Sequence, residues 1–216
     1  MNMHKESKNI PLANTAETIN LPSGTTLYQS GDIADGIFIV KKGILKVLAP
    51  SSINRKRIAD LYGEGDVLAT AAIDNKPHHE TVIAVHDCIL YPLNAEESMN
   101  NRKLREYILK NLAKQLRRNR ELIDDSELPV GARVTRSFFR LSQRFGQEPD
   151  ENGMVKLPLS LTHEDLASLT GSSRVTITRI LGELRNKGVV LGTRGVYLVN
   201  QVELEIATDS YVLQVI

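Results

Sequence analysis

The sequence predicts an α+β fold in three consecutive parts: an N-terminal β-roll, one long helix and a C-terminal winged helix-turn-helix. Short apolar stretches separated by glycines run from residue 17 to 95, which favours strands joined by tight turns. Residues 96–125 contain no Gly or Pro and many good helix formers. Between 161 and 190 two short helical patterns meet at a glycine, and a hairpin pattern follows. The predicted parts are a flexible tail at 1–16, the β-roll at 17–95, a dimerisation helix at 96–125, a hinge at 126–131, the winged helix-turn-helix at 132–200 and a C-terminal extension at 201–216.

The composition is that of an ordinary globular protein with room for two hydrophobic cores. Apolar residues make up 41% of the 216 positions and charged residues 25%. No apolar run reaches the ~20 residues of a membrane span, and the first residues lack a signal-peptide pattern, so we expect a cytoplasmic protein that does not enter a membrane. The single cysteine, Cys88, excludes an intramolecular disulfide, a cysteine-only zinc site and an iron–sulfur cluster. Its apolar surroundings predict a buried structural role.

The long helix carries an apolar seam with alternating spacings of three and four residues, as in a coiled coil. A second apolar set, Leu104, Ile108 and Leu122, lies to one side and is suited to cover the β-roll. The alternative is one helix packed only on its own domain, but the polar Asn119 within the seam favours a dimer because such a residue fixes register. Pro129 then ends the helix. The predicted dimer interface is Leu109, Leu112, Leu116, Asn119 and Ile123.

The segment 161–190 predicts a helix-turn-helix. Thr162 with Asp165 three residues later is close to a capping box and marks a helix start. Gly171 supplies the positive φ of a tight turn, and a second helix is expected from Ser172 or Ser173 to Lys187. A helix over 130–145 and a strand over 154–157 are expected before it, and a two-stranded wing over 189–198 after it.

The second helix of this motif predicts contacts with duplex DNA. Arg174, Val175, Thr178 and Arg179 share the face opposite its apolar stripe and lie in its N-terminal half, the end that enters a major groove. Arginine can bind guanine O6 and N7 together, and valine can contact a thymine methyl. Serine and threonine hydroxyls at the helix start can bind phosphates. An alternative is a solvated face used for protein contacts. The predicted DNA-binding residues are Thr162, Ser172, Ser173, Arg174, Val175, Thr176, Thr178, Arg179 and, at the wing tip, Arg194.

A row of arginines on the preceding helix offers a further basic surface. Arg133, Arg136, Arg140 and Arg144 recur at spacings of three and four residues. Such a row is usually a solvated face, and beside a DNA-contacting helix it could follow the phosphate backbone.

These motifs resemble the cyclic-AMP receptor protein/fumarate-nitrate regulator (CRP/FNR) family of bacterial transcription factors. The β-roll pattern is LPSGTTLYQSGD at 21–32 with GIFIVKKG at 36–43, and the helix-turn-helix pattern is LTHEDLA at 161–167 with GSSRVTITR at 171–179. The resemblance implies a homodimer that binds two-fold symmetric DNA, with half-sites ~34 Å apart, and RNA polymerase as a further partner. The helix at 174–179 is most similar to that of the cyanobacterial global nitrogen regulators, which implies a GTA-type half-site.

The residues that hold a cyclic nucleotide in this family are absent. Ala69 and Thr70 stand where the family has Gly-Glu, and Glu80 and Thr81 stand where it has the phosphate-binding Arg-Ser. A carboxylate repels a cyclic phosphate that arginine would bind through two hydrogen bonds, so we predict that cyclic AMP does not bind tightly. The alternatives are an oxo-acid such as 2-oxoglutarate, or no effector at all. The predicted effector pocket is Leu68, Ala69, Thr70, Glu80, Thr81, Lys114, Arg118 and Asn119.

Other classes of function have weaker support. His78, His79 and His86 invite a metal or haem site, but adjacent strand histidines point to opposite faces, so we expect neither metal nor cofactor. Metal-dependent enzymes with β-rolls need spaced histidine ligands that are missing here, and we expect no enzyme. A module that binds only other proteins is a second rival, which the helix-turn-helix opposes. The apolar end of the 201–216 extension is expected to dock on its own domain or on a partner.

Overall fold

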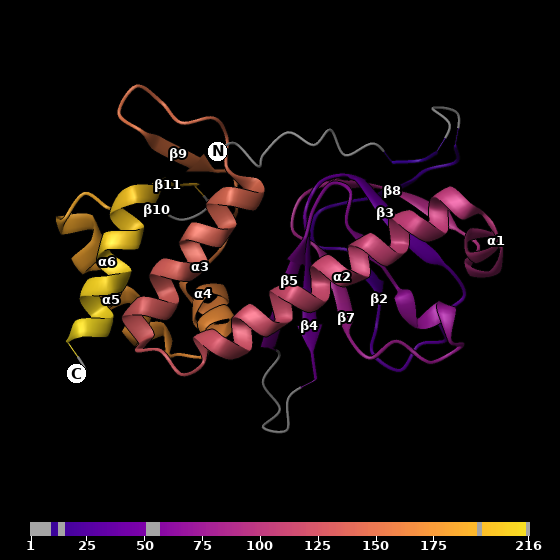
Figure 1. The fold of residues 1–216 in the computed structure, drawn as a ribbon, viewed down its shortest axis with the longest axis horizontal. Helices are drawn as coiled ribbons and strands as arrows, with labels where there is room; N and C mark the ends of the chain where they lie inside the picture. Colours follow the sequence, from indigo (N-terminus) through magenta and orange to yellow (C-terminus); the bar gives the residue numbers. More distant parts are fainter. Residues whose placement is uncertain (1–9, 13–15, 51–56, 194–195, 215–216) are drawn as a thin grey trace. The chain divides into compact units, whose positions relative to one another are not determined.

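The computed structural model describes residues 10–12, 16–50, 57–193 and 196–214. The chain forms two compact units, 1–119 and 120–216. Each unit has its own secondary structure and core and is described by itself below (Figure 1).

Unit 1 is a β-roll of two antiparallel four-stranded sheets, as predicted. One sheet has the order β1-β8-β3-β6, from strands β1 (Ile19–Leu21), β8 (Cys88–Leu93), β3 (Ile37–Lys42) and β6 (Val67–Leu68). The other has the order β2-β7-β4-β5, from strands β2 (Thr26–Tyr28), β7 (Thr81–Ala84), β4 (Leu45–Ala49) and β5 (Arg57–Tyr62). A short 3-10 helix, η1 (Thr70–Ile73), follows β6.

The predicted helix over 96–125 is in fact two helices, α1 (Ala95–Asn100) and α2 (Arg102–Asp125). The break falls at Asn101, whose side-chain oxygen accepts from the amides of Lys103 at 3.0 Å and Leu104 at 3.2 Å. Asparagine caps a helix in this way without needing Gly or Pro, which explains why the break was not predicted.

The core of unit 1 consists of two apolar clusters. One lies among the strands and includes Leu45, Val82 and Cys88. Cys88 is 2% exposed, as its predicted role requires, and burial raises the pKa of its thiol. In the other cluster Leu104 and Ile108 of α2 pack against strand residues, so these two members of the second apolar set cover the β-roll as predicted.

Unit 2 contains the predicted winged helix-turn-helix and one further helix. Its elements are α3 (Val130–Phe145), β9 (Met154–Leu157), α4 (His163–Thr170), α5 (Arg174–Asn186), β10 (Val190–Thr193), β11 (Val196–Asn200) and α6 (Gln201–Leu213). The wing strands β10 and β11 pair antiparallel, and β9 adds a third strand in the order β10-β11-β9. In the core, Phe138 and Tyr197 meet edge to face with ring centroids 5.2 Å apart.

The helix α6 was not predicted as a helix. Asn200 starts it, because its side-chain oxygen accepts from the amides of Val202 and Glu203 at 3.1 and 3.2 Å. Leu204 and Ala207 bury one face of α6, which packs on α3. The extension therefore docks on its own domain, one of the two possibilities expected from its apolar residues.

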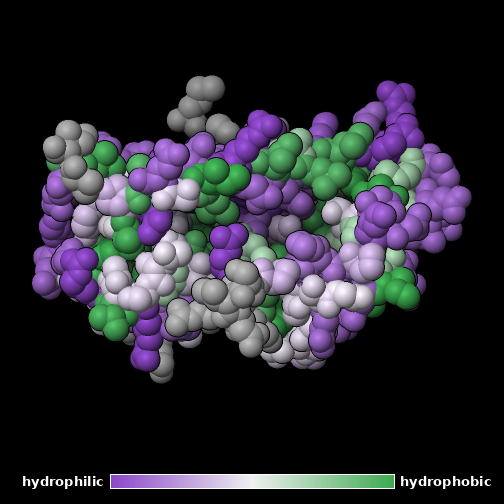
Figure 2. Space-filling model, turned by 90° about the horizontal axis from the view of Figure 1, so that it is seen from below, coloured by the Kyte–Doolittle hydropathy of each residue, from purple (hydrophilic) through white to green (hydrophobic). Residues whose placement is uncertain are grey.

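Hydrophobic residues are also exposed among hydrophilic ones (Figure 2). Exposure of single apolar side chains is normal, so only those that share one face of an element are informative. In the described part of the chain, no helix combines the length and apolar character needed to cross a membrane.

Candidate nucleic-acid interface and effector region

Side-chain caps define where the two helices of the helix-turn-helix begin. Thr162 caps α4 in a capping box: its hydroxyl oxygen accepts from the Asp165 amide at 3.1 Å, and the Asp165 carboxylate accepts from the Thr162 amide at 2.9 Å. Gly171 ends α4 with a φ of +59°. Ser173 Oγ then accepts from the Thr176 amide at 3.1 Å and starts α5. The predicted turn and both helix starts are confirmed.

The second helix, α5, has one buried and one exposed face. The predicted inner stripe is buried, with every member at most 1% exposed: Ile177, Ile180, Leu181 and Leu184. The predicted DNA-contacting side chains are exposed on the other side: Arg174, Val175, Thr178 and Arg179. Val175 is 79% exposed, so its methyl groups are free to contact a thymine methyl.

Hydroxyl side chains gather at the start of α5. Ser172 Oγ lies 3.0 Å from the Thr170 hydroxyl, and Ser173 Oγ lies 2.9 Å from that of Thr176. Ser172 and Thr176 are half-buried and Ser173 is exposed. These hydroxyls and the helix N-terminus form a polar, uncharged surface of the kind that accommodates phosphate oxygens. Arg194, predicted at the wing tip, lies outside the described residues.

Two contacts on the exposed face were not predicted. His163 Nδ1 lies 2.9 Å from the Thr178 hydroxyl, which also donates to the Arg174 carbonyl at 2.9 Å. Arg179 Nη1 forms an ion pair with Glu183 Oε1 at 2.5 Å. The i,i+4 spacing of Arg179 and Glu183 was a sequence signal for that pair, whereas His163 and Thr178 lie on different helices and no spacing marks them.

The arginine row on α3 is largely engaged within unit 2. Arg136 and Arg140 form ion pairs with Asp125, the last residue of α2. Arg133 donates to the carbonyl of Ser126 at 3.2 Å. These side chains tie α3 to the segment before it, so three of the four arginines have partners within unit 2.

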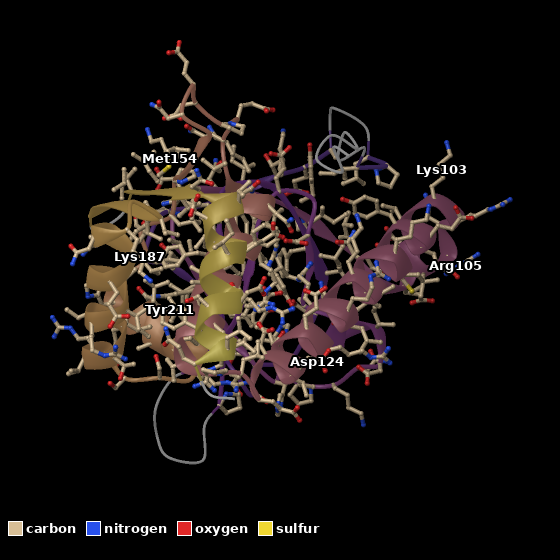
Figure 3. All side chains as sticks on the ribbon, turned by 60° about the vertical axis from the view of Figure 1, so that its left-hand side comes forward. Lys103, Arg105, Asp124, Met154, Lys187 and Tyr211 are labelled. Carbon is tan, nitrogen blue, oxygen red and sulfur yellow. The ribbon has the colours of Figure 1, made fainter. Side chains whose placement is uncertain are left out.

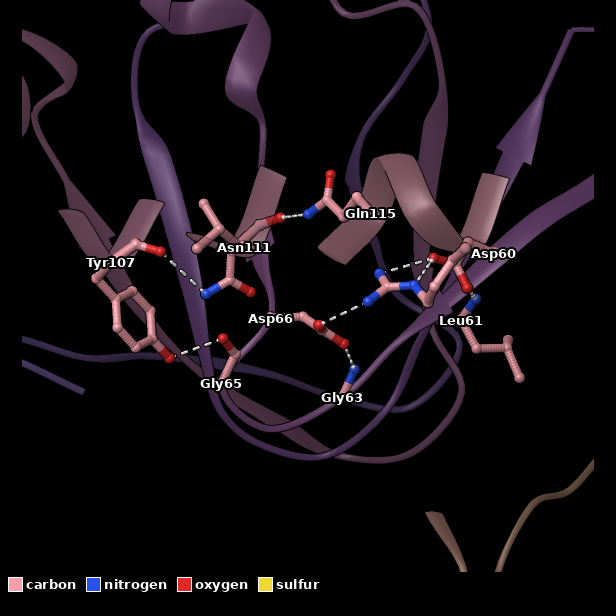
Figure 4. Close-up of polar contacts among 10 residues, drawn as sticks. Asp60, Leu61, Gly63, Gly65, Asp66, Tyr107, Asn111 and Gln115 are labelled. Atoms are coloured by element: carbon pink, nitrogen blue, oxygen red, sulfur yellow. Dashed lines mark hydrogen bonds and ion pairs between the residues drawn. The ribbon is translucent and has the colours of Figure 1, made fainter. Parts of the chain in front are cut away.

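In unit 1 several polar side chains on one face of α2 lie against the end of β5, the segment after it and β6 (Figure 4). The Tyr107 hydroxyl donates to the Gly65 carbonyl at 2.7 Å, and Gln115 Nε2 donates to the Val67 carbonyl at 2.7 Å. Between them, Asn111 is buried and donates to the Tyr107 carbonyl at 3.3 Å. Burial raises the pKa of Tyr107 to about 12, so this hydroxyl stays a donor at neutral pH.

Arg118, a predicted effector residue, binds two carboxylates of the β-roll, those of Asp60 and Asp66, which Figure 4 labels. Its Nη2 lies 2.8 Å from Asp60 Oδ2 and its Nη1 lies 3.4 Å from Asp66 Oδ1. All three side chains are between 13% and 17% exposed. Burial lowers the pKa of Arg118, but Asp60 and Asp66 raise it above its ordinary value. The guanidinium charge is therefore balanced from within the chain.

The other predicted effector residues, at β6 and η1 and on α2, differ in their burial. Leu68 and Ala69 are buried in the strand core, and Ala69 has a φ of +60°, which is rare for a residue other than glycine. Thr70 begins η1 and is half-buried. Lys114 and Asn119 are exposed. Lys114 lies one helical turn before Arg118 on α2, but its side chain is exposed while that of Arg118 is largely buried.

Glu80 and Thr81, which stand in place of the family's Arg-Ser, have partners in the β-roll. The Thr81 hydroxyl accepts from the Ser30 amide at 3.1 Å. The Tyr28 hydroxyl lies 3.5 Å from Glu80 Oε1, at the long limit for a hydrogen bond. Burial, with the Glu80 charge next in size, raises the pKa of Tyr28 above its ordinary range. A carboxylate and a neutral phenol therefore stand here in place of a phosphate-binding arginine.

His78 stacks on the Tyr28 ring with centroids 3.7 Å apart. It is 4% exposed, and burial lowers the pKa of its imidazole despite nearby carboxylates. Among the described residues no group of three or more His, Cys, Asp and Glu side chains is placed to hold a metal ion.

Known proteins match both units of the chain. Residues 18–100 match the cyclic nucleotide-binding domain, and residues 132–205 match the Crp-like helix-turn-helix domain. The CRP-like cAMP-activated global transcriptional regulator of Mycobacterium tuberculosis is 25% identical over 183 residues, which cover 82% of this chain and 81% of that protein. The global nitrogen regulator of Nostoc is 25% identical over 173 residues, 76% of this chain and 77% of that protein.

Solved structures show the same fold. A CRP/FNR-family transcriptional regulator from Thermus thermophilus superposes with a TM-score of 0.76 at 22% identity, covering 90% of this chain and all of that one. The matches to a cyclic nucleotide-binding domain and to a Crp-like helix-turn-helix domain identify a DNA-binding transcription regulator. With both domain matches in this order, the chain belongs to the CRP/FNR family.

Proposed function

We propose that this regulator binds a palindromic DNA site as a homodimer and that cyclic AMP does not gate the binding. The observation that carries the proposal is the exposed face of α5, where Arg174, Val175, Thr178 and Arg179 stand on a helix fixed by its caps and its buried stripe. A preorganised face of this kind enters a major groove with its N-terminal half.

The seam of α2 supports the homodimer. Leu109, Leu116 and Ile123 are 56%, 55% and 68% exposed, at the predicted seam spacing of seven residues. Leu112 is half-buried and Asn119 is exposed between them. A second copy of α2 would cover this stripe in a coiled-coil contact. Two copies of α5 would then meet two half-sites, for which the GTA type is our expectation.

The effector region supports binding without cyclic AMP. Glu80 stands where a cyclic phosphate would need a cation, and Arg118 is balanced by Asp60 and Asp66. Neither observation favours 2-oxoglutarate, which would have to displace both carboxylates from Arg118. We also expect RNA polymerase as a partner and the cytoplasm as the location, since these follow from acting on transcription.

Mobility shifts with the full chain test the proposal. The wild-type protein first selects duplexes from a randomised pool without added ligand, and the selected site becomes the probe. We expect a palindrome, bound equally with and without cyclic AMP. Arg174→Ala and Arg179→Ala should each cost ~1–3 kcal/mol of binding free energy at matched salt.

Arg102→Ala, which removes an arginine 85% exposed at the start of α2, is the matched control and should bind like the parent. Unchanged binding by both α5 variants would contradict base contact by this helix. Calorimetric titration that gives micromolar or tighter binding of cyclic AMP would contradict the second half of the proposal.

A further inference from the structure

The C-terminal helix α6 reaches the DNA-contacting face of α5 through a chain of three side chains. The Tyr211 hydroxyl donates to Glu183 Oε2 at 2.9 Å. The other oxygen of the same carboxylate, Oε1, holds Arg179 Nη1 at 2.5 Å. Tyr211 and Arg179 thus bind different oxygens of the Glu183 carboxylate and do not compete for the same one.

Tyr211 is itself held firmly. Its ring lies on the backbone of α3 at Gly131, where even a methyl group would overlap the ring. One turn earlier on α6, the hydroxyls of Thr208 and Thr135 meet at 2.6 Å, and Leu204 is fully buried. Figure 3 shows Tyr211 on the part of α6 that runs beside the other helices of unit 2. Glycine at 131 is what allows the ring to approach this closely.

The ion pair alone would not hold Arg179 in one position. The Arg179 and Glu183 side chains are 65% and 39% exposed, and an exposed i,i+4 pair contributes little and leaves both side chains mobile. A hydrogen bond from a fixed hydroxyl to a carboxylate is stronger and directional. Burial, followed by the bond to Glu183, raises the pKa of Tyr211 to about 12, so the hydroxyl remains a donor at neutral pH.

We infer that Tyr211 and Glu183 are positioning residues for base contact by Arg179, so that α6 helps to set DNA selectivity. The inference rests on the proposed contact between α5 and bases. Holding the guanidinium by one nitrogen reduces the freedom it loses on binding and leaves its remaining N–H groups for a base. The gain in binding free energy applies only where Arg179 contacts its preferred base pair, so the effect is one on selectivity.

Tyr211→Phe is the sharpest test because it removes the hydroxyl and keeps the ring on Gly131. The assay measures affinity for the selected palindrome and for versions with each base pair of the half-site changed. We expect Tyr211→Phe to lower selectivity at one base pair about 3- to 10-fold, which is the net contribution of one ordinary hydrogen bond, with the others unchanged. The ratio of affinities is the readout, since Arg179→Ala also alters the non-specific attraction to DNA, which affects all duplexes alike.

A double-mutant cycle shows whether the effect passes through Arg179. In an Arg179→Ala background, Tyr211→Phe should change selectivity no further. Tyr197→Phe is the matched control: its hydroxyl bonds the Leu161 carbonyl at 3.2 Å in the same unit, so its loss should lower thermal stability without moving selectivity.

The outcomes separate the two claims. Unchanged selectivity in Arg179→Ala would overturn the proposed base contact itself. A selective loss in Arg179→Ala with none in Tyr211→Phe would overturn only the positioning role. Equal effects of Tyr211→Phe in both backgrounds, or a matching loss in Tyr197→Phe, would reduce Tyr211 to a structural residue.

Discussion

Replacing Arg118 by methionine tests whether this side chain is a structural clamp or a ligand-binding cation. Methionine keeps the apolar stem against the β-roll and removes the charge. Asp60 and Asp66 then lose their common cation, while Asp60 Oδ1 still accepts from the Leu61 amide at 2.7 Å and Asp66 Oδ2 from the Gly63 amide at 2.9 Å. The free energy of unfolding lost in Arg118→Met therefore reports on the two ion pairs.

The size of the effect follows from the two distances. At an effective dielectric of about 20, pairs at 2.8 and 3.4 Å correspond to gross attractions of about 6 and about 5 kcal/mol. Desolvation offsets most of this, and breaking a buried pair typically costs ~3–5 kcal/mol. Since all three side chains keep 13–17% exposure, we expect a loss that reaches somewhat below that range, about 2–4 kcal/mol.

Urea unfolding followed by circular dichroism measures the loss, and hydrogen exchange over residues 57–68 assigns it to the β-roll. The variant that combines Arg118→Met with Asp60→Asn and Asp66→Asn should recover most of the stability, because no charge is then left unpaired. A loss below about 1 kcal/mol in Arg118→Met, or no recovery in the triple variant, would refute the clamp. If Arg118 instead binds an anion, 2-oxoglutarate will stabilise the wild type by mass action and fail to stabilise Arg118→Met.

Three further predictions concern the seam, the buried histidine and the first cap. Leu116→Glu places like charges across the proposed coiled coil, so it should convert the dimer to monomer in analytical ultracentrifugation and abolish binding to the palindrome while binding to a single half-site persists weakly. His78→Phe keeps the stack on Tyr28 and removes an imidazole whose pKa burial lowers from 6.5 in the folded state. In the wild type the stability contributed by neutral His78 is full above pH 6.5 and is lost as the pH falls through the lower folded pKa. In the variant this pH dependence of the urea midpoint should vanish. Thr162→Ala removes the α4 cap and should cost about 1 kcal/mol in thermal unfolding, whereas Thr162→Ser should cost far less.

Local chemistry made the helix-turn-helix predictable from the sequence. Thr162 and Asp165 form a capping box within four residues, Gly171 marks a positive φ, and Ser173 caps the next helix. Each of these interactions is made within a few positions along the chain, so the residue types alone predict it. The exposed and buried faces of α5 follow equally from helical spacing.

Contacts between distant segments were not predictable in this way. Tyr107 and Gln115 bond carbonyls more than 40 residues away, and nothing in their spacing indicates that the loop between β5 and β6 lies opposite. Arg118 was expected near an effector because the family places one there, but its carboxylate partners come from β5 and from the loop that follows it. For the apolar end of the 201–216 extension the sequence predicted only docking, because the contact that Tyr211 makes there is with a glycine 80 positions earlier.

The two sides of α2 differ in residue type, and the apolar periodicity therefore marks the outer side more clearly than the side toward the β-roll. The side toward the β-roll combines apolar residues, Leu104 and Ile108, with polar residues that bond backbone carbonyls. Polar residues on a buried face blur the apolar periodicity from which such a face is predicted. The seam at Leu109, Leu116 and Ile123 has no such partners among the described residues and keeps an uninterrupted seven-residue repeat. A helix whose inner face is held by hydrogen bonds can present its seam at a constant angle, and we expect the Leu116→Glu dimer defect to appear without any loss of β-roll stability.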